Sequence, residues 1–288
     1  MEHAQGILED THAILNGHLI SIYEPAVSFS NRAFRYGDSL FESIRVTNGK
    51  VMFLKDHMTR LKLSMIVLRM NVPADFTSEN IEVMMLHLIQ KNNVGDDARI
   101  RFTVFRNEGG FYAPENNDIS FLIEAEKLDT KGYVLNQKGI WADIYADIRK
   151  PINKLSNLKT GNSLIFVMAA LAKNSMKLDD CFLVNELSNI CESISANIFV
   201  VKNGTLQTAP LTEGCIDGVM RKQIFKIAAA NKILVFETPI TVNTIMNGDE
   251  VFLTNSSKGI QWVGQLKNKF FTNSKAVYFT DKLNEAAR

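Results

Sequence analysis

The sequence predicts an α+β fold in two domains, and three observations support this prediction. Segments with strand-like alternation and segments with the helical spacing of apolar residues occur together in both halves of the 288-residue chain. A polar stretch, KLDTKGY at 127–133, separates the halves. The apolar fraction of 46% suffices for a core in each half. We therefore expect an N-terminal domain over 1–127, a linker over 128–133 and a C-terminal domain over 134–288.

Local signals in the first half predict strands and two helices. An Asn-Gly pair at 48–49, a strong hairpin signal, divides residues 41–54 into two strands. Thr77 or Ser78 has the kind of side chain that begins a helix, and we expect a helix to follow it. The other expected elements are strands over 19–29, 98–106 and 119–128, and a helix over 55–70 with Met58, Leu61, Met65 and Leu68 on one face.

The second half is richer in expected strands. A second Asn-Gly pair, at 203–204, divides residues 197–209 into two strands. Apolar runs predict further strands over 140–148, 181–185 and 250–255, and we expect helices to begin near Asn162 and Gly218.

The overall charge argues against nucleic acid or an acidic membrane surface as the main partner. The 32 basic and 31 acidic residues leave a formal net charge of +1, and no basic block is dense. The first ten residues lack a signal-peptide pattern, and no apolar run approaches the ~20 residues of a membrane span.

Cys181, Cys191 and Cys215 show no CxxC spacing, so we expect reduced thiols in a cytoplasmic protein. The five histidines show no metal-ligand spacing, so we expect no metal site.

Lys159 lies in an unusual place for a lysine. The run LIFVMAALA at 164–172 is apolar on every side, which predicts a helix buried in a core. Lys159 would lie just before the N-terminus of that helix, where a cation opposes the helix dipole. One explanation is a side chain that reaches solvent. The other is a lysine whose charge is suppressed by burial from its usual pKa of about 10.4, because only the neutral amine attacks a carbonyl to form a Schiff base.

Pyridoxal phosphate would need further polar groups, and the sequence offers each of them. Glu192, among small and apolar residues, could face the pyridine nitrogen and keep it protonated. Gly214 and Gly218 precede a helix whose first amides, those of Val219 and Met220, could bind an anion. Hydroxyls follow the strand that ends in TNSS at 254–257, and Arg60 adds a fixed positive charge. Each of these groups could also have a purely structural role, as a glutamate at the end of a strand, a capped helix or a surface residue.

Four sequence blocks together resemble the fold-type IV (class IV) pyridoxal-phosphate enzymes. This family includes branched-chain aminotransferases, D-amino acid aminotransferases and 4-amino-4-deoxychorismate lyases. The blocks are RYGDSLFESIRVTNGKVMFLKDHMTRL at 35–61, Lys159 followed by Asn162, ESISANIFVVKNGTLQTAPLTEGCIDGVMR at 192–221, and EVFLTNSS at 250–257. The resemblance covers nearly the whole chain.

The resemblance implies a fold, a cofactor and a set of roles. It implies a smaller N-terminal α/β sandwich, a larger C-terminal pseudo-barrel that binds pyridoxal 5'-phosphate, and a homodimer with the active site between the domains. Lys159 would form the Schiff base and carry the proton, and neither Lys150 nor Lys154 is followed by the same Asn-containing helix start. The other implied contacts are Glu192 at the pyridine nitrogen, Ile216, Ser195 and Asn197 beside the ring, Arg60, Val219, Met220 and Ser256 at the phosphate, and Tyr36, Phe41, Arg101 and Ser257 on the substrate side.

The chain departs from every subgroup of this family. Branched-chain enzymes carry a Tyr-x-Arg pair where ARIRF stands here, so Arg101 matches the arginine and Arg99 replaces the tyrosine. They also carry a tyrosine after the lysine, where KTGNS ends in Ser163, which leaves the ring hydroxyl of the cofactor without its usual partner. YGDSLFESIR and FRNEGGFYAP resemble the lyases more, yet Phe111 stands where lyases commonly have an arginine.

Arg99 and Arg101 lie two residues apart in an alternating strand, so their side chains share one face. They either form a solvated face with two unpaired cations or receive substrate carboxylates.

Three functions remain open. The first is transfer of an amino group between an amino acid, with a branched-chain type favoured, and a 2-oxo acid. The second is 4-amino-4-deoxychorismate lyase activity, which yields 4-aminobenzoate and pyruvate. The third is a binder without catalysis, which the presence of both Lys159 and Glu192 disfavours.

Overall fold

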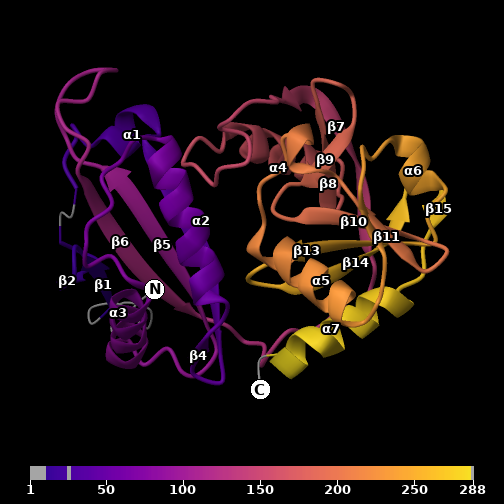
Figure 1. Ribbon diagram of the computed structural model, residues 1–288, viewed down its shortest axis with the longest axis horizontal. Coiled ribbons are helices and arrows are strands. Elements are labelled where there is room, and N and C mark those ends of the chain that lie inside the picture. Colours follow the sequence, from indigo (N-terminus) through magenta and orange to yellow (C-terminus); the bar gives the residue numbers. More distant parts are fainter. Residues whose placement is uncertain (1–10, 25–26, 287–288) are drawn as a thin grey trace. The chain divides into compact units, whose positions relative to one another are not determined.

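The computed structural model describes residues 11–24 and 27–286, which form two compact units (Figure 1). The first unit runs to Gly132 and also includes the short segment Lys159–Asn162. The second unit comprises Tyr133–Leu158 and everything from Ser163 onward. Helices and strands occur in both units, which confirms the predicted α+β class. The expectation about a signal peptide concerns the first ten residues, which lie outside the described residues.

The first unit is built on a six-stranded antiparallel sheet. Its strands follow the order β2-β1-β6-β5-β3-β4. Helices α2 and α3 pack against this sheet and against each other (Figure 1). The bounds are β1 His12–Leu15, β2 His18–Ser21, α1 Arg32–Tyr36, β3 Ser39–Thr47, β4 Lys50–Val51, α2 Leu54–Val67, α3 Ser78–Lys91, β5 Ala98–Arg106 and β6 Ile119–Lys127.

Several local predictions for this unit are confirmed. Asn48 and Gly49 both adopt positive φ, 50° and 72°, and connect β3 to β4 as the predicted two-residue hairpin. Thr77 is the N-cap of α3, and its hydroxyl accepts a hydrogen bond from the Asn80 amide at 3.2 Å. The predicted strand over 19–29 is wrong in its bounds, because β2 ends at Ser21. A third Asn-Gly pair, at 16–17, makes the hairpin between β1 and β2.

The second unit is built on a nine-stranded mixed sheet. The main path is β12-β11-β10-β13-β14-β7-β8-β9, and β15 pairs with β14. The bounds of its elements are β7 Ile140–Lys150, α4 Leu164–Ser175, β8 Asp180–Asn185, β9 Ile190–Ser193, β10 Asn197–Lys202, β11 Thr205–Thr208, the 3-10 turn Leu211–Glu213, α5 Val219–Ala230, β12 Val235–Glu237, α6 Val242–Met246, β13 Glu250–Asn255, β14 Gly259–Leu266, β15 Lys269–Phe270 and α7 Ser274–Ala286.

The two ends of this sheet meet. The Ile190 amide in β9 donates to the carbonyl of Ile240, which follows β12, at 2.7 Å, and both side chains are fully buried. The sheet therefore curves back toward itself, as the predicted pseudo-barrel requires. Stacked rings of Phe199 and Phe252, 5.2 Å apart, fill the contact with α5 and α7.

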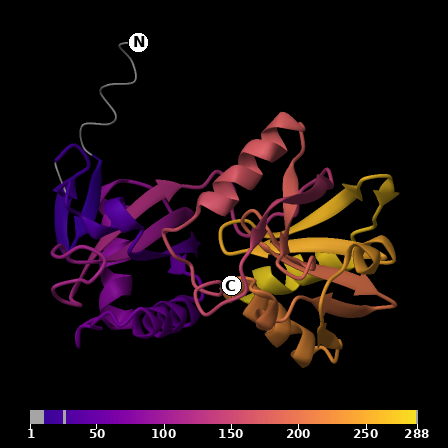
Figure 2. The same cartoon turned by 90° about the horizontal axis from the view of Figure 1, so that it is seen from above.

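Helix α4 contradicts one expectation. The sequence predicts that it is buried on every side, but within α4 only Ala169 is buried. Leu164, Val167, Met168 and Leu171, at helical spacing, are 77%, 49%, 43% and 56% exposed. Strands β7 and β8 cover only one side of the helix, and Figure 2 shows it standing out from the rest of its unit. We call these four residues the α4 stripe.

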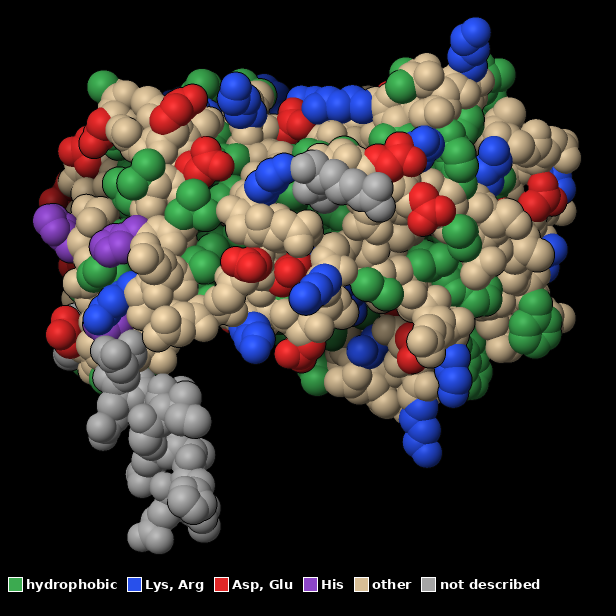
Figure 3. All heavy atoms as spheres, turned by 90° about the horizontal axis from the view of Figure 1, so that it is seen from below, with side chains coloured by type: hydrophobic (Ala, Val, Ile, Leu, Met, Phe, Trp, Pro, Cys, Tyr) green, Lys and Arg blue, Asp and Glu red, His purple; other side chains and the backbone are tan. Residues whose placement is uncertain are grey.

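The described surface carries charges of both signs. On the face shown in Figure 3, Lys and Arg side chains are interspersed with Asp and Glu. Cys181, Cys191 and Cys215 are buried free thiols, as expected. Across residues 11–24 and 27–286, no helix has the length and apolar character needed to cross a membrane.

A buried ionic cluster joins β3 to α2 in the first unit. The Glu42 carboxylate accepts a hydrogen bond from Arg60 Nε at 2.8 Å, pairs with Arg60 Nη2, and lies 2.7 Å from His57 Nδ1. Burial alone raises the pKa of the Glu42 carboxyl, but the Arg60 guanidinium and the His57 hydrogen bond outweigh it and lower that pKa to about 2. Burial lowers the pKa of His57, against the raising effect of Glu42. Glu42 thus fixes the plane of the Arg60 guanidinium.

This cluster predicts a dependence of stability on pH. Since the Glu42 pKa falls from 4.5 to about 2 on folding, its contribution is complete above pH 4.5 and is lost as the pH falls toward 2. The shift corresponds to roughly 3 kcal/mol of unfolding free energy. Glu42→Gln should lower stability at pH 7 and flatten the decline between pH 5 and 3, as measured by urea unfolding. Exposed Glu24→Gln is the control, and an equal decline in both variants would contradict the assignment.

Candidate functional site

The predicted site residues are divided between the two units. The group in the first unit is Tyr36, Phe41, Arg60, Arg99, Arg101 and Lys159, and the group in the second unit is Glu192, Ser195, Asn197, Ile216, Val219, Met220, Ser256 and Ser257.

Backbone hydrogen bonds attach the segment that carries Lys159 to the start of β3. The Phe41 amide donates to the Lys159 carbonyl, and the Gly161 amide donates to the Ser39 carbonyl, both at 2.9 Å. A Cβ at Gly161 would lie 2.3 Å from Ser39 Oγ, so the close approach requires glycine here. The KTGN segment therefore acts as a short extra strand of the first unit, an arrangement that its sequence did not indicate.

The Phe41 ring holds two cations. The Lys159 ammonium nitrogen and the guanidinium carbon of Arg101 each lie 4.2 Å from the ring centroid. An amine able to attack a carbonyl and a guanidinium able to bind a carboxylate are thus brought to one aromatic side chain.

Arg99 and Arg101 are paired across the sheet, which argues against the alternative of two unpaired cations. Arg99 Nη1 lies 3.2 Å from Glu126, and Arg101 Nε lies 4.0 Å from Glu124, each opposite on β6. The arginine side chains are 37% and 40% exposed, so these pairs are weak. A carboxylate ligand could therefore displace Glu124 from Arg101 at little cost.

Arg32 organises the loop beside Tyr36. Its Nη1 donates to the carbonyls of Gly109 at 3.0 Å and Phe111 at 2.6 Å, and its Nε pairs with Asp38 at 2.9 Å. The Tyr36 ring packs 5.5 Å from the Tyr112 ring. Phe111 and Tyr112 are 81% and 89% exposed, so this fixed loop presents two aromatic rings to solvent.

Glu192, in β9, is the buried carboxylate of the second unit. Only 3% of its side chain is exposed. Its Oε2 accepts a hydrogen bond from the Ile216 amide at 2.9 Å, and its Oε1 pairs with the ammonium group of Lys150. The Lys150 contact joins residues 42 positions apart and was not predicted.

The segment before α5 is tightly built around glycines. Helix α5 begins at Val219, as predicted, and its N-cap Gly218 offers no side chain to its first amides. A Cβ at Gly218 would lie 1.9 Å from Asn197 Oδ1, and Asn197 Nδ2 donates to the Ile216 carbonyl at 2.8 Å. Asn197 and Glu192 thus bind the same short segment.

The two predicted serines after β13 lie in a turn. The Asn255 side chain shapes this turn by accepting a hydrogen bond from the Lys258 amide at 2.8 Å. Ser256 and Ser257 are half-buried there. Ser195 is exposed in the bend between β9 and β10.

Asn157 is a further residue that sequence reasoning missed. Its Nδ2 donates to the carbonyls of Leu211 at 2.8 Å and Cys215 at 2.6 Å, and its own carbonyl accepts the Asp217 amide at 3.2 Å. The chain just before Lys159 is thereby fastened to the segment that binds Glu192. An isolated asparagine in a polar loop carries no sequence signal for this role.

These residues fit pyridoxal phosphate, the cofactor of class IV aminotransferases. Glu192 is a buried carboxylate that its neighbours hold in place, as a pyridine nitrogen requires. Its partner Ile216 lies only three residues before Val219, so the same segment carries the first amides of α5, where a phosphate binds well.

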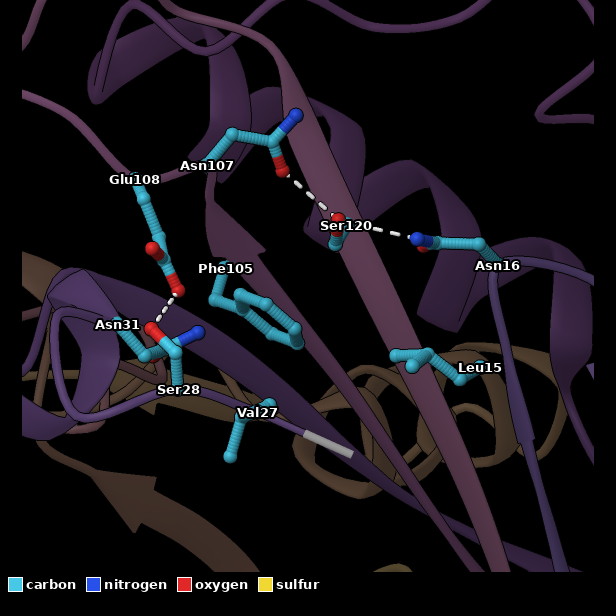
Figure 4. Close-up of a pocket in the computed structure, with 9 residues that line it drawn as sticks. All are labelled: Leu15, Asn16, Val27, Ser28, Asn31, Phe105, Asn107, Glu108 and Ser120. Carbon is cyan, nitrogen blue, oxygen red and sulfur yellow. Dashed lines mark hydrogen bonds between the residues drawn. The ribbon is translucent and has the colours of Figure 1, made fainter. Parts of the chain in front are cut away.

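A separate cleft of about 250 Å³ lies in the first unit, between β1, β6 and the segment before α1 (Figure 4). Ser30 donates to the Glu108 carboxylate at 2.6 Å, and the Ser120 hydroxyl donates to Asn107 at 2.7 Å. The residues that line it are Leu15, Asn16, Val27, Ser28, Asn31, Phe105, Asn107, Glu108 and Ser120. It contains no predicted site residue, so it is not the candidate active site.

Comparison with known proteins connects this geometry to one family. The family model described as amino-transferase class IV matches residues 39–266. A Methanocaldococcus jannaschii protein, provisionally named a branched-chain-amino-acid aminotransferase, is 30% identical over 94% of this chain and 93% of its own. The branched-chain aminotransferase structure from Thermoproteus uzoniensis, solved with norvaline, has a TM-score of 0.85 at 25% identity and covers 96% of this chain and 93% of its own. A Legionella pneumophila structure, provisionally named a 4-amino-4-deoxychorismate lyase, has a TM-score of 0.83 at 25% identity and covers 93% and 97%. The chain belongs to the class IV aminotransferases and is an enzyme of that family.

Proposed function

We propose that this chain uses pyridoxal 5'-phosphate to transfer an amino group between an amino acid, with a branched-chain type favoured, and a 2-oxo acid. The observation that carries the proposal is the placing of Lys159 and Arg101 on the Phe41 ring. An amino acid presents a carboxylate and a reacting amino carbon a short distance apart. Arg101 would bind the carboxylate, and Lys159 would act at the amino carbon. The names of the M. jannaschii and T. uzoniensis relatives favour a branched-chain substrate.

Each residue then has a defined task. Pyridoxal phosphate, when bound, supplies the electron sink for the electrons of the broken Cα–H bond. Lys159 would hold the cofactor in the resting enzyme, and its neutral amine would accept and return the α-proton of the substrate. Arg101 holds the substrate carboxylate through its planar guanidinium. On the substrate side, Tyr36, Phe41 and Ser257 shape the remaining contacts.

The cofactor contacts come from the remaining predicted residues. Glu192 would keep the ring nitrogen protonated through its buried carboxylate. Ile216, Ser195 and Asn197 would contact the ring. The Val219 and Met220 amides at the start of α5, the Ser256 hydroxyl and Arg60, whose guanidinium Glu42 orients, would bind the phosphate.

The chemistry of the ring separates Lys159 from Lys150. Lys150 pairs directly with Glu192, the carboxylate that would hold the ring nitrogen. The reactive aldehyde of the cofactor is on the opposite side of the ring from that nitrogen, so Lys150 would be the wrong lysine to bond to it. Lys154 is exposed in the loop after β7.

A second candidate is 4-amino-4-deoxychorismate lyase activity. Arg99 stands where branched-chain enzymes have a tyrosine, and it gives the substrate face a second guanidinium. The lyase substrate carries two carboxylates, which a pair of arginines would suit. The L. pneumophila relative resembles this chain at an identity equal to that of the T. uzoniensis structure.

We also propose a cytoplasmic homodimer. The α4 stripe is a continuous apolar surface on one helix, and solvent exposure of such a stripe is unfavourable. A second copy of the chain would cover it with the same apolar residues, as a two-fold interface allows. Buried thiols without disulfides agree with a reducing compartment.

Borohydride reduction tests the assignment of Lys159. Reduction of the purified, yellow protein should fix the cofactor to a peptide that contains Lys159. Lys159→Ala should retain the cofactor through its phosphate contacts but lose turnover by several orders of magnitude. Lys154→Ala, in an exposed loop, is the control and should retain turnover. Fixation to Lys150 or Lys154 would overturn the assignment.

Paired assays with arginine variants test the substrate. A panel of amino donors with 2-oxoglutarate measures transamination, and pyruvate release from aminodeoxychorismate measures the lyase. We expect transamination with branched-chain donors. Arg101→Ala should weaken the binding of every carboxylate substrate. Arg99→Ala should weaken the binding of dicarboxylates by ~1.5–3 kcal/mol, the contribution of a charge-assisted hydrogen bond. Small and equal effects on both classes of substrate would place this face outside the active site.

Sedimentation or light scattering tests the dimer. The wild-type protein should have twice the mass of the chain, and Val167→Glu with Leu171→Glu should shift it toward monomer by burying charge in the interface. Leu63→Glu, a 58% exposed position on α2, is the control and should leave the mass unchanged. A monomeric wild-type protein, or a stripe variant that remains dimeric, would contradict the assignment.

A further inference from the structure

We propose that Lys150 is a positioning residue: its ammonium group pairs with the Glu192 carboxylate in the absence of cofactor and competes with the cofactor ring nitrogen for that carboxylate. This inference rests on the proposed use of pyridoxal phosphate. It adds a role for a second lysine, different from that of Lys159.

The path of β7 brings Lys150 to Glu192. Lys150 is the last residue of β7 and pairs with Asn185 on β8, after an irregularity in register that follows Tyr145. Such a bulge re-aims the side chains that follow it. Glu192 lies on β9, opposite Leu183. The lysine side chain therefore crosses β8 to reach the carboxylate on the next strand.

Burial distinguishes this pair from an ordinary surface ion pair. The side chains of Lys150 and Glu192 are 5% and 3% exposed. The Lys150 nitrogen also lies 5.2 Å from the Phe166 ring centroid, on α4. A strand-end lysine can usually extend its head into water, and a buried ion pair rarely repays the cost of its desolvation. Burial of this ion pair thus costs free energy, and the packing of the two side chains alone does not explain why the pair is buried.

Lys150 balances the charge of Glu192, because the other groups described next are neutral or are paired elsewhere. Burial, followed by the charge of Glu192, raises the pKa of Cys215 to about 12 and the pKa of Cys191 further still, so both remain neutral thiols. Arg221 is engaged elsewhere, with the Glu237 carboxylate and the Ala209 carbonyl. The Ile216 amide contributes a hydrogen bond but no formal charge.

A protonated ring nitrogen would have to share Glu192 with Lys150. Each carboxylate oxygen already has one partner, the ammonium on Oε1 and the Ile216 amide on Oε2. The ring would add a second cation beside the first, and like charges close together oppose each other. Lys150 therefore keeps the carboxylate aimed in the free protein and limits how tightly the cofactor is held.

Cofactor affinity provides the test. Pyridoxal phosphate is titrated into the cofactor-free full-length protein and its dissociation constant is measured by fluorescence. Lys150→Met keeps the length of the side chain and removes the charge, so the cofactor should bind more tightly, on the order of tenfold. Lys150→Arg should bind within about twofold of wild type, and exposed Lys154→Met is the control for loss of a lysine. Equal or weaker binding by Lys150→Met would overturn the proposal, since a purely structural lysine predicts weaker binding.

A double-mutant cycle tests the pair without cofactor. Lys150→Met should destabilise the cofactor-free protein by leaving a buried carboxylate unpaired, and adding Glu192→Gln should restore most of the loss. Recovery of folding in the double variant alone supports the pair, whereas additive losses, or failure of both variants to fold, would contradict it. A wild-type protein that binds no pyridoxal phosphate would refute the proposed function, while this cycle would still report on the pair.

Discussion

The buried carboxylate of Glu192 is the constraint on which the second unit depends. An ionised carboxylate without solvent needs partners, and the chain supplies a backbone amide from Ile216 and the ammonium of Lys150. The first contact fixes the segment before α5, because Asn197 binds the same segment and Gly218 leaves no room for a side chain. The second contact requires β7 to end where it does. Strand ends, a glycine and the start of a helix are therefore set by the need to satisfy one charge.

The first unit applies the same principle with different groups. Glu42 is buried, and its interactions with Arg60 and His57 offset the free-energy cost of its desolvation. A carboxylate again fixes the position of a cation. The backbone of Lys159 pairs with the start of β3. The Phe41 ring then brings its amine to Arg101.

Local rules predicted much of the fold. The Asn-Gly hairpins at 48–49 and 203–204, the Thr77 cap and the start of α5 each depend on a few adjacent residues, and the structure confirms them. The buried state of α4 was predicted wrongly, because apolar composition alone does not say whether a helix is covered by the rest of its own chain. The contact between Lys150 and Glu192 could not be predicted from the sequence, because it depends on a bulge in β7 and on the order of three strands. The roles expected for Lys159 and Glu192 were suggested by the chemistry of their surroundings, and the resemblance of four blocks to one family made them specific.

The protonation state of the cofactor nitrogen tests the central claim about Glu192 most directly. Pyridoxal phosphate labelled with ¹⁵N in the ring can be bound to the wild-type protein and to Glu192→Gln, and the ring nitrogen observed by NMR. We expect a protonated nitrogen in the wild type and an unprotonated one in the variant, because only a carboxylate charge holds that proton at neutral pH. The same nitrogen resonance in both proteins would show that Glu192 does not face the ring.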